Sequence, residues 1–155
     1  MTRTMNPLFN AVEICSLLSS LDKMGVTSTL VARQTAKVVG PVLADFGKMT
    51  IGTEMKAGSL SDFITLMNSA LEIGGLADPK ATLMTKSENG YSLKWVDCGQ
   101  KDMVEAGKLF GYPGCPICLP SVVVAGLLGA LKIGDVQEMK VDRSGNTCTM
   151  QIRVA

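Results

Sequence analysis

The chain of 155 residues contains no histidine. This absence excludes a Ser-His-Asp or Cys-His catalytic group, a histidine metal ligand and a histidine-ligated haem. Any acid–base catalysis would have to use Asp, Glu, Lys, Tyr or Cys side chains. The glutamates are scattered along the chain, and no pair of carboxylates stands out as suited to such work.

Neither sign of charge is in real excess. There are 15 Lys and Arg residues against 14 Asp and Glu, and no block of basic residues. Binding to nucleic acid or to an anionic membrane surface therefore has little electrostatic support. Apolar residues make up 46% of the chain and charged residues 19%, so a buried core is expected and disorder is not.

The chain also lacks an apolar run long enough to span a membrane. The most apolar stretch, residues 117–131, has about fifteen residues, whereas a bilayer-crossing helix needs roughly 20. We interpret it as a buried helix, because Pro120 and Ser121 lie at its start. The N-terminus shows no secretory signal, since Glu13 interrupts its apolar stretch. We therefore expect a cytoplasmic protein with no membrane span and with cysteines as free thiols.

The hydrophobic pattern changes period along the chain. Helical spacing gives way to alternation and then returns, which predicts helices over residues 6–25, 27–48, 58–75, 101–111 and 119–132 and strands over residues 80–87, 90–98, 135–143 and 147–155. The order is helices, hairpin, helices, hairpin. We predict an α+β fold, with a four-stranded antiparallel sheet of two hairpins covered on one face by helices.

Three local signals refine this prediction. Asn89-Gly90 is a strong hairpin turn between the first two strands. Alternation places Tyr91, Leu93 and Trp95 on one face of the second strand. Pro41 lies inside the second helical pattern and predicts a kink or break near Gly40.

Four of the five cysteines are candidate metal ligands. Cys15 lies on an apolar helix face and is interpreted as a small core residue. Cys115 and Cys118 form a CxxC turn before the apolar helix, a usual way to present two thiolates to a tetrahedral metal. Cys98 and Cys148 reach the same rim if the two hairpins pair. Four thiolates favour a structural zinc ion, and an iron–sulfur cluster or a CxxC redox centre remains an alternative.

Three blocks of sequence together resemble the 4-vinyl-reductase-like family, also described as a hydrocarbon-binding domain. They are ARQTAKVVGPVLADFG, ALEIGGLADPKATLMTKSENGYSLKWVDC, and the segment that begins GCPICLPSVVVAGLLGALK and runs to the C-terminal hairpin. The resemblance implies an α+β fold related to subunits of TRAPP-type vesicle-tethering particles. It also implies a single domain over residues 1–155 that forms a homodimer, with residues 1–26 as a dimerisation or packing helix.

The resemblance further implies an apolar ligand cavity and, in one branch, a zinc site of mostly cysteine ligands near the last hairpin. Cys98, Cys115 or Cys118, and Cys148 match cysteine positions of that branch. Two departures stand out: this chain has SGNTC where the branch has a GDPYC-like turn, and it lacks the histidine that holds a phenolic ligand in some relatives. Without an attached DNA-binding or ATPase module, sensing would act through a protein partner.

The function expected from these residues is binding of a small apolar molecule, without catalysis. A set of aromatic and methionine side chains could line its cavity or could equally fill the core: Phe63, Met67, Trp95, Phe110 and Tyr112. Two other functions remain open. One is a thiol redox protein or metal carrier that uses Cys115 and Cys118, and the other is a scaffold subunit without a ligand.

Overall fold

The sheet contains two antiparallel hairpins joined along their inner strands. A computed structural model describes residues 6–51, 56–73, 83–88, 90–96, 98–134, 136–145 and 147–155. Its strands are β1 (Leu83–Ser87), β2 (Gly90–Trp95), β3 (Val136–Ser144) and β4 (Thr147–Val154), in the spatial order β1-β2-β4-β3. Every neighbouring pair is antiparallel, which confirms the predicted four-stranded sheet.

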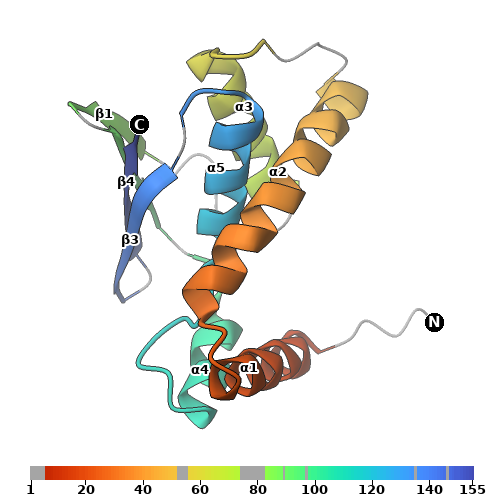
Figure 1. The fold of residues 1–155 in the computed structure, drawn as a ribbon, viewed down its shortest axis with the longest axis vertical. Helices are drawn as coiled ribbons and strands as arrows, with labels where there is room; N and C mark the ends of the chain where they lie inside the picture. The colour runs from red at the N-terminus through yellow and green to blue at the C-terminus, as the bar shows by residue number, and fades with distance from the viewer. Residues whose placement is uncertain are drawn as a thin grey trace.

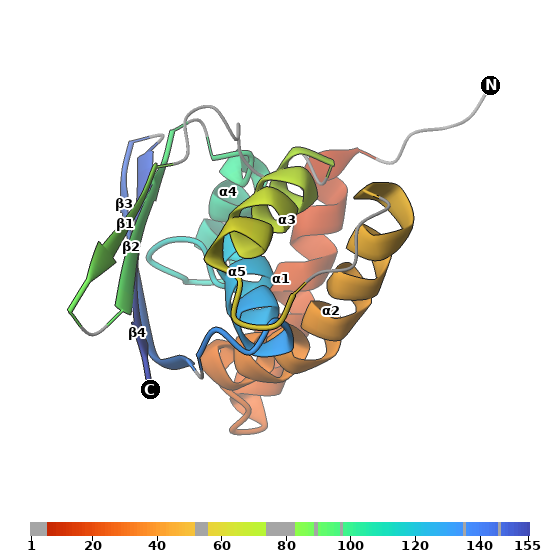
Figure 2. The same cartoon turned by 90° about the horizontal axis from the view of Figure 1, so that it is seen from above.

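Helices cover one face of this sheet, as predicted (Figure 2). The described helices are α1 (Pro7–Lys23), α2 (Ser28–Ile51), α3 (Leu60–Ile73), α4 (Lys101–Leu109) and α5 (Leu119–Ala130). Helix α5 packs against α2 and α3, while α1 pairs with α4 at one end of the molecule (Figure 1). The α+β class is therefore confirmed. Among the described residues, no helix combines the length and hydropathy needed to cross a membrane.

Helix α5 is central because it is apolar on nearly all sides. It begins after Cys118, which has extended backbone dihedrals, and a proline occupies its first turn. Eight of its twelve residues are buried, including Val124, Leu127 and Leu128. A helix without a polar face must be covered on several sides, and here the sheet lies on one side and α2 on another.

Helix α2 continues through Pro41, so of the predicted kink or break near Gly40 the break is wrong. The physical reason is the packing of α2 along α5, which compensates for the hydrogen bond that the proline nitrogen cannot donate. The two helices approach closely at Gly40 and Gly126. A Cβ atom at Gly126 would lie 2.7 Å from the Ala36 carbonyl oxygen, and one at Gly40 would clash with the Gly126 carbonyl.

The core consists of two clusters. The larger lies between the sheet and the helices α3 and α5, where Leu93 and Trp95 meet Phe63 and Leu127. Tyr91, Leu93 and Trp95 are all buried, which confirms the alternation predicted for β2. The smaller cluster joins α1 and α4 to the start of α5. It contains Cys15, which is fully buried as a core residue should be, with its Sγ 3.6 Å from the Met103 Sδ.

Candidate functional site

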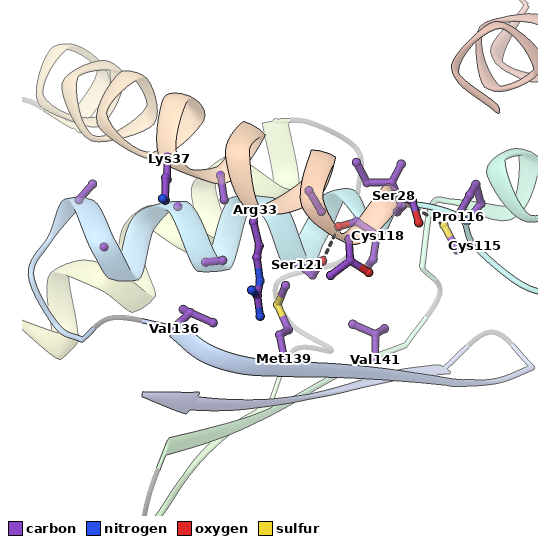
Figure 3. Close-up of a pocket in the computed structure, with 18 of the residues that line it drawn as sticks. Ser28, Arg33, Lys37, Cys115, Pro116, Cys118, Ser121, Val136, Met139 and Val141 are labelled. Carbon is purple, nitrogen blue, oxygen red and sulfur yellow. Dashed lines mark hydrogen bonds between the residues drawn. The ribbon is translucent and has the colours of Figure 1, made fainter. Parts of the chain in front are cut away.

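A groove of about 760 Å³ lies between α2, α5 and β3 (Figure 3). It forms because the two helices touch through small residues at Gly40 and Gly126 and leave space on the side that faces β3. A volume of roughly 300–1,000 Å³ is usual for small-molecule sites. The groove therefore has the size of a ligand site.

The surfaces of this groove, which we call the α2–α5 groove, are mainly apolar. Helices α2 and α5 contribute small residues, and β3 contributes three larger side chains: Ala32, Ala36, Ala125, Gly129, Ala130, Val136, Met139 and Val141. A few hydroxyl groups, including those of Ser28, Thr29 and Ser121, lie among them. Such a lining suits an apolar molecule that is oriented by a small number of polar contacts.

Two basic side chains of α2 border the groove, Arg33 and Lys37. They are four residues apart and so lie on the same side of the helix. Figure 3 shows Arg33 reaching from α2 toward Met139 on β3. Its Nη2 donates a long hydrogen bond of 3.5 Å to the Gln137 carbonyl oxygen. Neither side chain forms an ion pair with another described residue.

The four predicted metal ligands line a second, smaller hollow of about 440 Å³, which we call the cysteine hollow. Cys98 follows β2, and Cys148 pairs with Trp95 in the β2–β4 register. Cys115 and Cys118 come from the loop between α4 and α5. Because β4 pairs with β2 across the sheet centre, the ends of both hairpins reach this loop.

The thiols in the cysteine hollow bond to the protein and to each other. The Cys115 thiol donates to the Ile117 carbonyl oxygen at 2.9 Å and lies 3.6 Å from the Gln100 Oε1. Gln100 is buried, and its Oε1 also accepts the Leu119 amide at 3.0 Å, which ties the loop to the start of α5. Cys98 and Cys148 share a side-chain hydrogen bond.

Burial keeps most of these thiols protonated. It raises the pKa of Cys115 and of Cys148 to about 12 and that of Cys118 to about 11. Burial is the largest cause, and neighbouring cysteines contribute to the rise at all three, because a second negative charge in the hollow is unfavourable. Arg143 acts in the opposite direction on each. A cation in the hollow would reverse this balance and favour thiolates.

The four cysteines fit a thiolate-bound metal in number, chemical type and placement around one hollow. Their described side-chain positions do not yet converge: in the described part of the chain, no three His, Cys, Asp or Glu side chains are arranged to hold a metal ion. Asp97, a possible partner of Cys98 from its position, lies outside the described residues. A metal would require side-chain rotation, first of all at Cys115, which now bonds to Ile117.

The groove and the cysteine hollow adjoin. Five residues line both: Ser28, Cys115, Pro116, Cys118 and Val141. The CxxC loop therefore borders both spaces, and Figure 3 shows Cys115 and Cys118 at one end of the groove.

The five side chains considered as ligand contacts do not line the α2–α5 groove. Phe63, Met67 and Trp95 are fully buried in the larger core cluster, and Phe110 packs against the smaller one. Tyr112 lines the cysteine hollow instead, and its hydroxyl donates to Asp22 at 2.6 Å. Sequence reasoning missed Arg33 and Lys37. Their four-residue spacing beside small residues on α2 was the available signal.

No protein-family model matches the chain, and no curated protein is similar enough to count as a relative. The resemblance to the 4-vinyl-reductase-like family therefore stays a prediction made from the residues.

Proposed function

We propose that this protein binds a small, largely apolar molecule in the α2–α5 groove and does not transform it. The observation that carries the proposal is the groove itself: about 760 Å³ of space beside an otherwise tightly packed helix pair. The described lining supplies apolar contact, hydroxyl groups and two cations rather than a carboxylate pair for acid–base work. This is also the function that the family resemblance implies.

The proposal includes a structural zinc ion held by Cys98, Cys115, Cys118 and Cys148. Its support is that four thiols from three separate segments line one hollow. A tetrahedral thiolate site would tie the two hairpins to the start of α5, and binding would release the thiol protons. Because the CxxC loop also borders the groove, the metal would hold one end of the ligand site in place.

The raised thiol pKa values count against the redox alternative. A dithiol catalyst needs a thiolate near neutral pH, and its pKa is usually lowered for that reason. Here burial raises the pKa of Cys115 to about 12 and that of Cys118 to about 11. An iron–sulfur cluster uses the same four donors and would be recognised by its visible absorption.

A homodimer completes the proposal. Helix α2 exposes Val38 and Val42 by 69% and 62% on the side that faces away from α5. Helix α1 exposes Phe9 and Leu17 by 55% and 62%. Exposed apolar side chains on neighbouring helices are typical of a contact surface, and we assign this one to a second copy of the chain.

Binding in the groove is tested with the neutral fluorescent dye Nile red. We expect saturable binding by the purified protein and loss of binding in Ala32→Phe, because the larger ring fills the groove. The matched control is Lys48→Phe, which adds a similar ring at an exposed position of the same helix outside the groove and should bind normally. Equal binding by both variants would contradict the assignment of the site.

Native mass spectrometry of freshly purified protein tests the metal and the dimer together. We expect two chains with one zinc ion each, and loss of zinc in Cys118→Ser. Cys15→Ser is the matched control, because Cys15 lies in the separate core cluster of α1 and α4 and should leave the metal in place. A metal-free chain with a Cys115–Cys118 disulfide would instead favour the redox alternative.

A further inference from the structure

We infer that the occupant of the α2–α5 groove is an anion: an amphiphile with an apolar body and a carboxylate that is bound by Arg33 and Lys37. This inference rests on the proposed function and specifies the chemical class of its ligand. It comes from the charges around the groove, which are of one sign.

The described residues that line the groove include two cations and no Asp or Glu. The acidic residues of the adjoining strand do not correct this imbalance. Alternation along β3 places Met139 and Val141 toward the groove and Glu138 and Asp142 on the other face of the sheet. Glu138 already pairs there with Lys140 and Arg153, at 3.6 and 3.5 Å. The groove therefore has a net positive charge among its described residues.

The two cations are placed where a ligand would meet them. Arg33 and Lys37 share one side of α2, and the long side chain of Arg33 extends from α2 toward β3 (Figure 3). Among the described residues, Arg33 donates one hydrogen bond, to the Gln137 carbonyl, which leaves its other donors available to a ligand there. The guanidinium plane can therefore bind both oxygens of a carboxylate.

When a ligand occupies the groove, the sign of its charge affects how well the two cations remain solvated. Both side chains are exposed, so water now solvates their charges. A bound apolar molecule would displace part of that water, and a neutral ligand could not replace it. A carboxylate replaces water with charge-assisted hydrogen bonds, while the apolar body covers Val136, Met139 and the alanines.

The test compares two molecules that differ only in the head group. Decanoate and decanol, both below their aggregation concentrations, compete with Nile red for the wild-type protein at near-neutral pH. We expect decanoate to bind about tenfold more tightly, which corresponds to about 1.4 kcal/mol. The preference should decrease as salt is added, because the cations are exposed and screened.

In the variant Arg33→Met/Lys37→Met, decanoate should lose its advantage, so that decanoate and decanol bind with the same affinity. Lys48→Met is the matched control, since Lys48 is an exposed cation of α2 that does not line the groove, and it should keep the preference.

The possible results separate this inference from the function on which it rests. If wild-type protein binds Nile red but binds decanol as tightly as decanoate, the anionic class is wrong and apolar binding stands. A preference that survives in the double variant overturns the assignment to Arg33 and Lys37. If the protein binds none of the three molecules, both proposals fail.

Discussion

Replacing Gly126 by alanine should push α2 and α5 apart. A Cβ atom at this position would lie 2.7 Å from the Ala36 carbonyl oxygen and 2.9 Å from the Gly40 nitrogen. The first distance is about 0.7 Å shorter than the 3.4 Å at which ordinary contacts begin. Both neighbours are backbone atoms, so the helix axes must move and no side-chain rotation can relieve the clash.

Two opposing effects set the size of the change. Inserting a methyl group into a packed interface destabilises by about 1–3 kcal/mol. Replacing glycine by alanine inside a helix stabilises by about 1 kcal/mol. The net expectation for Gly126→Ala is a loss of about 0–2 kcal/mol, which alone is too close to zero to be decisive.

Gly129→Ala isolates the packing effect. Gly129 lies one turn later in the same helix, is exposed, and has no atom within 4 Å of an added Cβ. It should gain the helix stabilisation without the clash. The two variants should therefore differ by about 1–3 kcal/mol, or roughly 2–12 °C in Tm for a chain of this size.

Urea unfolding followed by far-ultraviolet circular dichroism measures the free energy of unfolding of both variants. Both glycines line the groove, but only Gly126→Ala should move α2 away from α5, so Nile red affinity should change more in Gly126→Ala than in Gly129→Ala. If Gly126→Ala proves as stable as Gly129→Ala, the backbones of α2 and α5 do not approach closely at Gly126.

Three further predictions follow from the core, the thiols and the exposed helix face. In urea unfolding, Trp95→Ala should lower the free energy of unfolding by about 3–5 kcal/mol, because the ring is fully buried. Trp95→Phe should lower it less, by about 1–2 kcal/mol, because the Nε1 has no described hydrogen-bond partner to lose. The free energy of unfolding of the reduced, metal-free protein should fall from pH 9 toward 11, because unfolded thiols ionise near 9 while burial raises the pKa of Cys115 and Cys148 to about 12 and that of Cys118 to about 11. The comparison in urea unfolding is the variant Cys115→Ser/Cys118→Ser/Cys148→Ser; a wild-type profile no steeper than that of this variant argues against buried thiols. Val42→Glu should convert the dimer to a monomer in light scattering, whereas the same substitution at the exposed Lys140 on β3 should not; an unchanged dimer would place the interface elsewhere.

Local patterns were sufficient to predict the elements. The alternation at Tyr91, Leu93 and Trp95 predicted the buried face of β2, and the all-round apolar run predicted α5. Both signals come from neighbours along the chain, so they can be read without knowing the partners. Pro41 was the exception: a break was one of the two outcomes predicted there, and α2, packed along α5, is continuous.

The candidate sites depended on contacts between distant segments. Proposed metal ligands such as Cys98 and Cys148 were identified from residue type and position, and the β2–β4 pairing brings their hairpin ends together. The ligand contacts were harder to foresee, because Phe63, Trp95 and the other large side chains could serve either a core or a cavity. In the structure three of the five fill the larger core, and smaller residues of α2 and α5 surround the groove.

The sequence by itself determined the α+β class, the two hairpins and the helical elements, because periodicity and turn chemistry are properties of a few consecutive residues. The tertiary structure alone decided that Gly40 meets Gly126, that this contact leaves a groove beside it, and that Arg33 and Lys37 border that groove. A cavity is the space that remains between elements from distant parts of the chain. Its existence and its charge depend on how those elements pack, and no local pattern specifies that packing.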